Sequence, residues 1–262
     1  MKLKIGLGVL ATVLVAVAVI YFINAPRSGN ISYPSPNAYD TLSEANGKMT
    51  PLPMDFDTSQ DVEALQTYLD ANLDPLSLID QAARQRCLIR MADMQTMQEM
   101  HDKANYARGP MRLLYVKARL AELEGRSADA ADALAKIAVI GRKSAHGGLL
   151  IHQLVAVAIE RQGLEGLAQL ASKLSGDEKK RIAKLIRAED KDAPEIDAVI
   201  ESVMYREHDM TKREYGTFAG SFMIWQLSDS EAAEKPQEIL RNELTEIQEQ
   251  REELLTMLRV GP

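Results

Sequence analysis

The sequence is poor in the residues and motifs on which most enzyme sites depend. Cys87 is the only cysteine among 262 residues, so the chain can form no intrachain disulfide. Aromatic residues make up 5% of the chain and histidines number four. No GxSxG, P-loop, GxGxxG or CxxC motif stands in the context that its chemistry requires. We therefore predict no catalytic, cofactor-binding or metal-binding residues, and a protein that is not an enzyme.

Positive charge is also in short supply. The chain has 31 Lys and Arg against 38 Asp and Glu, a formal net charge of -7. A surface of this sign repels phosphate backbones, so we expect no nucleic-acid partner. Basic residues do cluster between Lys179 and Arg187, but Glu178, Glu189 and Asp190 flank them and no aromatic residue is available there to stack on bases. This pattern predicts a solvated helix face.

Alternating polar and apolar runs, the usual sign of strands, are scarce, and good helix formers dominate the composition. We predict an all-α fold. Glycine, proline and N-cap residues divide it into helices that we place at 37–46, 58–71, 75–105, 111–124, 128–142, 148–173, 177–189 and 194–213.

The longest apolar run lies near the start, where residues 5–23 read IGLGVLATVLVAVAVIYFI without a charge. As a helix this run approaches the ~30 Å hydrocarbon core of a bilayer. Lys2 and Lys4 precede it, which predicts a cytoplasmic N-terminus. A cleaved signal peptide is the alternative, although the run is longer than the ~7–15 apolar residues typical of one.

These features predict a single-pass protein of the bacterial cytoplasmic membrane. Residues 1–24 form the transmembrane anchor, which meets membrane lipid through residues 5–23. Residues 25–38, rich in Pro, Ser and Asn, form a flexible stalk. Residues 39–262 form an all-helical domain on the periplasmic face.

The C-terminal part of the chain contains two further features. Residues 216–235 gather large aromatic side chains, which suit either a plug in the core or an exposed surface for a partner. Residues 236–258 predict a short coiled coil, in which Arg251 takes one position of an otherwise apolar seam. The apolar positions of this seam are Leu240, Leu244, Ile247, Leu254 and Leu258. We expect it to dock on its own domain, with weak homo-oligomerisation as an alternative.

Residues 114–137, LYVKARLAELEGRSADAADALAKI, read as one tetratricopeptide-type helix pair. Ala118 and Ala121 are small residues for a close crossing, Gly125 forms the turn, and Ser127 is predicted to cap the second helix. The next run, GRKSAHGGLLIHQLVAVAIERQGLEGL at 141–167, does not repeat this unit. Together with the layout, residues 111–170 resemble uncharacterised bacterial membrane-anchored helical proteins. That resemblance implies the architecture and no activity.

Two groups of residues raise alternatives. Met91, Met94, Met97 and Met100, flanked by Cys87 and His101, could bind a soft metal from one helix. His152 and Glu160 could form a buried general base. For both we expect core packing instead. The triplet Glu207-His208-Asp209 is predicted to be a surface turn, because neighbouring helical residues point ~100° apart.

The sequence thus favours an interaction or scaffold protein that binds a protein partner through its helices. A helical enzyme that uses His152 and Glu160, and a soft-metal protein, are the alternatives.

Overall fold

The computed structural model describes residues 32–52, 59–94, 96–189, 194–215 and 231–259. Within these ranges the chain is all-α, as predicted, and contains no strand. The helices are α2 (Ala38–Lys48), α3 (Val62–Asp70), α4 (Leu73–Ala82), α5 (Met97–Lys103), α6 (Arg108–Leu123), α7 (Ser127–Ser144), α8 (Leu150–Leu170), α9 (Gly176–Ala188), α10 (Ile196–Tyr215) and α12 (Glu231–Met257), with 3-10 turns η2 (Met91–Asp93) and η3 (Ala171–Lys173).

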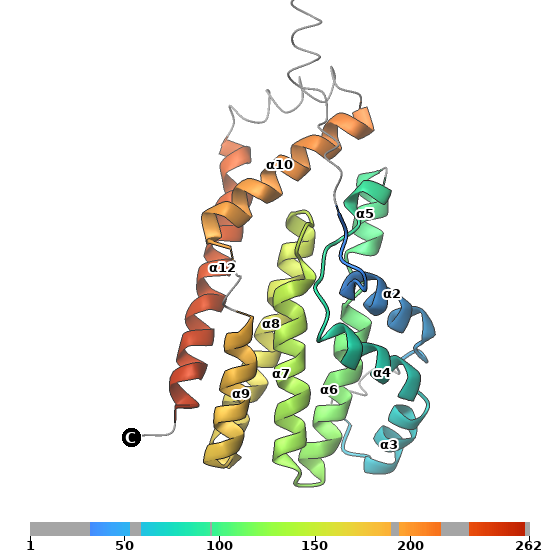
Figure 1. Cartoon of the computed structure of the whole chain (residues 1–262), viewed down its shortest axis with the longest axis vertical. Coiled ribbons are helices and arrows are strands. Elements are labelled where there is room, and N and C mark those ends of the chain that lie inside the picture. The colour runs from blue at the N-terminus through green and yellow to red at the C-terminus, as the bar shows by residue number, and fades with distance from the viewer. Residues whose placement is uncertain (1–31, 53–58, 95, 190–193, 216–230, 260–262) are drawn as a thin grey trace, which may run out of the picture.

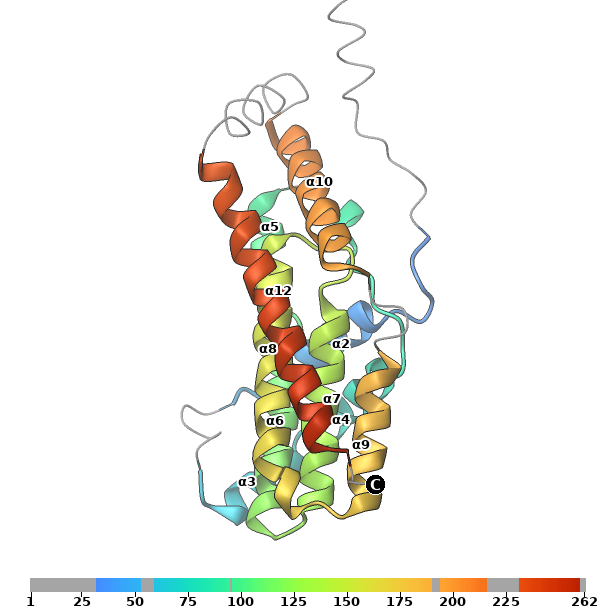
Figure 2. The same ribbon diagram turned by 90° about the vertical axis from the view of Figure 1, so that its left-hand side faces the viewer.

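Four helices that follow one another in the sequence form the centre of the molecule. Helices α6, α7, α8 and α9 run up and down along the long axis, and short connections join them (Figure 1). Helix α7 lies in the middle and packs against α6, α8 and α9. Helices α2, α3 and α4 cover α6 on one side, while α12 packs along α8 on the other (Figure 2).

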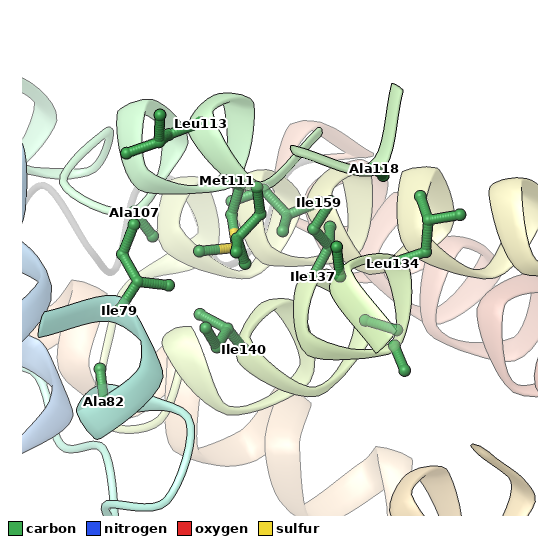
Figure 3. Packing of buried hydrophobic residues seen from close by; sticks show 14 of the residues in the cluster. Ile79, Ala82, Ala107, Met111, Leu113, Ala118, Leu134, Ile137, Ile140 and Ile159 are labelled. Atoms are coloured by element: carbon green, nitrogen blue, oxygen red, sulfur yellow. The ribbon is translucent and has the colours of Figure 1, made fainter. Parts of the chain in front are cut away.

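The hydrophobic core runs through this four-helix centre. Leu134, Ile137 and Ile140 of α7 are fully buried among Met111 of α6 and Ile159 of α8 (Figure 3). Burial of such side chains contributes ~1.5–3 kcal/mol each and is the main stabilising term. The apolar positions of α7 extend around most of its circumference, as expected for a helix with neighbours on several sides.

Glycines allow α7 and α8 to cross closely. A Cβ on Gly163 would lie 2.6 Å from the Ala138 backbone nitrogen, and one on Gly141 would lie 2.5 Å from the Glu160 backbone nitrogen. Both contacts are with backbone, which cannot move aside easily. Gly141 and Gly163 are therefore close-packing positions between α7 and α8.

The turn between α6 and α7 is only partly as predicted. Gly125 has φ +75° and ends α6, and the Arg126 N–H donates to the Ala121 carbonyl as in a Schellman motif. Ser127, however, is the first residue of α7 and does not cap it: the N-cap is Arg126, which makes no side-chain cap hydrogen bond. Arg126 instead forms ion pairs with Glu124 and Asp129.

The predicted long helix at 75–105 is wrong. Helix α4 ends at Ala82, and residues 86–90 have no regular secondary structure before η2 and α5. The buried Asn37 side chain bonds both the N–H and the C=O of Leu88, at 3.0 and 2.9 Å, and the Ile89 N–H donates to the His146 carbonyl at 2.9 Å. These tertiary hydrogen bonds replace the helical ones.

The C-terminal seam is used within the chain. Leu240, Ile247, Leu254 and Leu258 are buried, and α12 packs along α8 and α10. This is the docking arrangement that the sequence favoured. The aromatic segment 216–230 lies outside the described residues.

The predicted location in the membrane needs correction. No helix in the described part of the chain is both long enough and apolar enough to cross a bilayer. The predicted anchor at 5–23 lies outside the described residues. The single-pass arrangement in the bacterial cytoplasmic membrane is therefore not retained. At the end of the predicted stalk, Asn37 and Ala38 are buried, so the folded body already includes them.

Candidate functional site

The methionines do not all lie on one helix, contrary to the prediction of a single long helix that carries them. Met91 lies in η2, Met94 follows it in extended backbone, and Met100 lies in α5. All three are buried members of the main core. No cluster of three or more His, Cys, Asp or Glu residues that could hold a metal ion occurs among the described residues. The side chains of Met97 and His101 lie outside the described set.

Cys87 is a core residue. Its side chain is 5% exposed, and its sulfur lies 3.4 Å from the Tyr106 hydroxyl, which donates to the Ser144 carbonyl at 2.6 Å. Burial raises the pKa of the Cys87 thiol to about 11. A thiol in this state is a poor nucleophile at neutral pH.

His152 and Glu160 are both buried, but they serve different parts of the structure. The His152 Nδ1 accepts from the Leu149 N–H at 3.1 Å, so the imidazole fixes the first turn of α8. Glu160 lies two turns further on, about 12 Å along the helix axis. The cavity beside Glu160 is not lined by His152. The arrangement does not bring the two together as a general base and its partner.

Glu160 instead holds α12 to the bundle. Both Nε and Nη2 of Arg251 donate to Glu160 Oε1, the Nε at 3.1 Å, and the two side chains are 4% and 6% exposed. Arg142 of α7 approaches the same oxygen at 3.7 Å. The charged position that interrupts the apolar seam of α12 is therefore explained by a buried carboxylate on α8. The sequence of α12 alone shows that Arg251 interrupts the apolar seam, but it does not identify Glu160 as the partner.

A small cavity of about 110 Å³ opens beside this pair, between α7, α8, α10 and α12. Lys143 lines it and is already bound: its Nζ donates to the Ala83 carbonyl at 2.8 Å and lies 3.3 Å from Glu189 Oε1. His146 lies at the exposed rim. Local desolvation lowers the pKa of His146, and the neighbouring positive charges, Arg142 and Lys143 first, lower it further.

The predicted surface turn at Glu207-His208-Asp209 is wrong, because the triplet lies inside α10. Its side chains point in different directions, as the ~100° between neighbouring helical residues requires. Glu207 Oε1 accepts from the Leu150 N–H at 3.0 Å at the start of α8, while Asp209 pairs with Arg213 at 2.6 Å. His208 lines a separate surface hollow beside Met204. The triplet is thus structural, and Glu207 joins α10 to α8.

A polar groove lies between α6 and α8. We call it the α6/α8 groove, and its volume is about 320 Å³. Its floor is Ala118, Leu134 and Gly166, and its walls are Gln60, Tyr115, Arg119, Glu122, Gln162, Glu165 and Gln169. The wall residues of α6 recur at i, i+4 and i+7, and those of α8 at i, i+3 and i+7, so each set occupies one helix face.

The glutamines of this groove are available to a ligand. Gln162 and Gln169 are exposed, and neither side chain hydrogen-bonds to any of the described residues. Arg119 and Glu122 form a partly exposed ion pair at 3.7 Å. Sequence analysis missed this groove. The signal that could have found it is the row of polar residues at 162, 165 and 169, which share one face of the C-terminal half of α8.

No family model, curated protein or solved structure matches this chain. The function of the protein is therefore inferred from the geometry of its own residues.

Proposed function

We propose that the protein is a helical interaction protein that holds an extended segment of a partner polypeptide in the α6/α8 groove. The single observation that carries this proposal is the pair of exposed amides on one face of α8, Gln162 and Gln169, which form no hydrogen bond with the described part of the chain. A glutamine side chain has both a donor and an acceptor, so it complements the N–H and C=O groups of an extended backbone.

The spacing of the amides fits such a backbone. Gln162 and Gln169 are seven residues apart on α8, about 10.5 Å along the helix axis. Three residues of an extended chain span ~10 Å. A peptide of about four extended residues that runs along α8 is therefore long enough to reach both amides, with Tyr115 available for side-chain contact from α6.

The packing of the central helices supports the same role. Helix α8 lies against α7 and beside α6, while α9 packs on α7. In this proposal α6–α7 and α8–α9 are two stacked, tetratricopeptide-like helix pairs, and the groove is the channel between their first helices. The net charge of -7 favours a polypeptide partner over a nucleic acid.

The test begins with a displayed library of random peptides selected on the full-length protein. The selected peptides are then measured by fluorescence anisotropy against the double variant Gln162→Ala, Gln169→Ala. Each lost hydrogen bond is worth ~0.5–1.5 kcal/mol, so we expect the affinity to fall about 10- to 100-fold.

The matched control is Gln81→Ala, an exposed glutamine on α4 outside the groove. It should leave the affinity unchanged. Equal affinity of the selected peptides for wild type and the groove variant would refute the groove as the binding site. So would selected peptides that do not compete with one another and whose affinity changes in neither variant.

A further inference from the structure

A second surface lies where the C-terminal end of α12 meets α9 (Figures 1 and 2). A hollow of about 550 Å³ opens there. We call it the basic pocket, and it is lined by Lys180, Ala183, Lys184, Arg187, Ala188, Leu258 and Arg259. The lining contains four cationic side chains and no acidic one, on a protein whose net charge is -7.

The charges of the basic pocket are not neutralised by the described part of the protein. Lys184, Arg187 and Arg259 form no ion pair with any described residue. Lys180 reaches Asp177 at 3.9 Å, and that carboxylate is 99% exposed. Screening by water leaves such a pair weak.

Helix dipoles account for part of this arrangement. Arg187 and Arg259 lie at the C-terminal ends of α9 and α12, where cations offset the negative end of the macrodipole. Lys180 and Lys184 lie one to two turns before the end of α9, beyond the reach of that effect. These two lysines line the same pocket as the two arginines, and the four cations come from two helices that are distant in the sequence.

The floor of the pocket is apolar and limits the choice of ligand. Leu258 and Ala183 are 1% and 5% exposed, and Ala188 adds a further methyl group. The lining offers no aromatic residue for base stacking. A long polyanion would also meet the acidic surface beyond the pocket, whereas a short segment feels the local charge, which is screened over ~8–10 Å.

We infer that the basic pocket binds a short acidic segment of a partner protein, which places carboxylates against the cations and an apolar side chain on the floor beside Ala188. This surface is independent of the α6/α8 groove, because the two share no residue. A protein with both could hold two polypeptide segments at once.

The probe is a fluorescein-labelled synthetic peptide of glutamates with interspersed leucines, titrated into the full-length protein and followed by anisotropy. We expect saturable binding that weakens as salt is raised to about 0.15 M. The variant Lys184→Glu, Arg187→Glu should lower the affinity at least about tenfold, since two attractions become repulsions. Replacing the leucines of the peptide with serine should also weaken its binding to the wild-type protein, because the apolar contact with the floor is lost.

The matched control carries the same charge change elsewhere: Lys173→Glu with Arg84→Glu, both exposed and outside the pocket. It should bind the peptide as wild type does, and circular dichroism should show both variants folded. Three outcomes overturn the inference: equal loss in the control, tighter binding of a single-stranded RNA oligonucleotide that the pocket variant abolishes, or serine replacements without effect. The α6/α8 groove variant should bind the acidic peptide normally, so failure here and failure of the proposed function are separable.

Discussion

The buried ion pair between Glu160 and Arg251 allows a prediction with an asymmetric outcome. Replacing Glu160 with methionine leaves the guanidinium of Arg251 buried at 4% exposure without its carboxylate, and leaves Arg142 facing it. Removing one partner of a buried pair typically costs ~3–5 kcal/mol. For a chain of this size that corresponds to a fall in melting temperature of about 10 °C.

Replacing Arg251 with methionine should cost less. The carboxylate of Glu160 then still has the guanidinium of Arg142 at 3.7 Å, so it keeps an oppositely charged neighbour. We expect ~1–3 kcal/mol for this change. The double replacement of Glu160 and Arg251 by methionine removes both buried charges and keeps similar volumes, so it should be more stable than the Glu160 variant alone.

The assay is urea unfolding followed by circular dichroism, with hydrogen exchange to test whether α12 loses protection first. The control is Arg161→Met, which breaks a pair with Glu243 across the same α8–α12 contact, at 2.8 Å and with 27% and 34% exposure. It should cost less than ~1 kcal/mol. If the Arg251 variant were less stable than the Glu160 variant, the role assigned to Arg142 would be refuted.

Three further predictions concern stability and reactivity. Gly163→Ala should destabilise the protein by ~1–3 kcal/mol in urea unfolding, because the new Cβ meets the backbone of Ala138, whereas Gly47→Ala, with open space around it, should be neutral or stabilising. Cys87 should react with a thiol reagent at pH 8 far more slowly in the native protein than in guanidinium, because it is buried and its pKa is about 11; equal rates would contradict its burial. The pKa of His146 is lower in the folded state than in the unfolded state, so its contribution to stability is present above pH ~6.5 and is lost as pH falls through the folded value. In His146→Gln the melting temperature should fall less between neutral and acid pH than in wild type. An equal fall in both proteins would exclude this contribution of His146.

Local sequence patterns predicted the central helices well. Residues 111–124, 128–142 and 177–189 were placed within a few residues of α6, α7 and α9. In each case the information is local: a glycine with positive φ at 125 and a capping box between Ser175 and Glu178 mark the ends. The apolar periodicity in between identifies the buried face.

Prediction failed where distant residues decide the backbone. Residues 83–105 carry helix-forming side chains, but Asn37 and His146 supply hydrogen-bond partners to Leu88 and Ile89, and residues 86–90 are not helical. Propensity is worth a few tenths of a kcal/mol per residue, which several buried tertiary hydrogen bonds outweigh.

The candidate sites show the same division. The sequence identified His152 and Glu160 as buried polar residues, and both are buried. His152 bonds locally, to the Leu149 N–H three residues before it, whereas the role of Glu160 depends on Arg251 of α12, which the sequence does not place beside it. The α6/α8 groove and the basic pocket are each formed by residues from two helices, so neither can be predicted from one continuous segment of the sequence.

By itself, then, the sequence determined the all-α class, most helix boundaries and the set of apolar residues that form the core, because these follow from propensity, capping and periodicity along one segment. The tertiary structure decided which charge meets which, where the methionine segment leaves the helix, and where two helix faces enclose a groove. Those features are set by atoms that are close in space and far apart in the chain, and their energies exist only once the helices have packed.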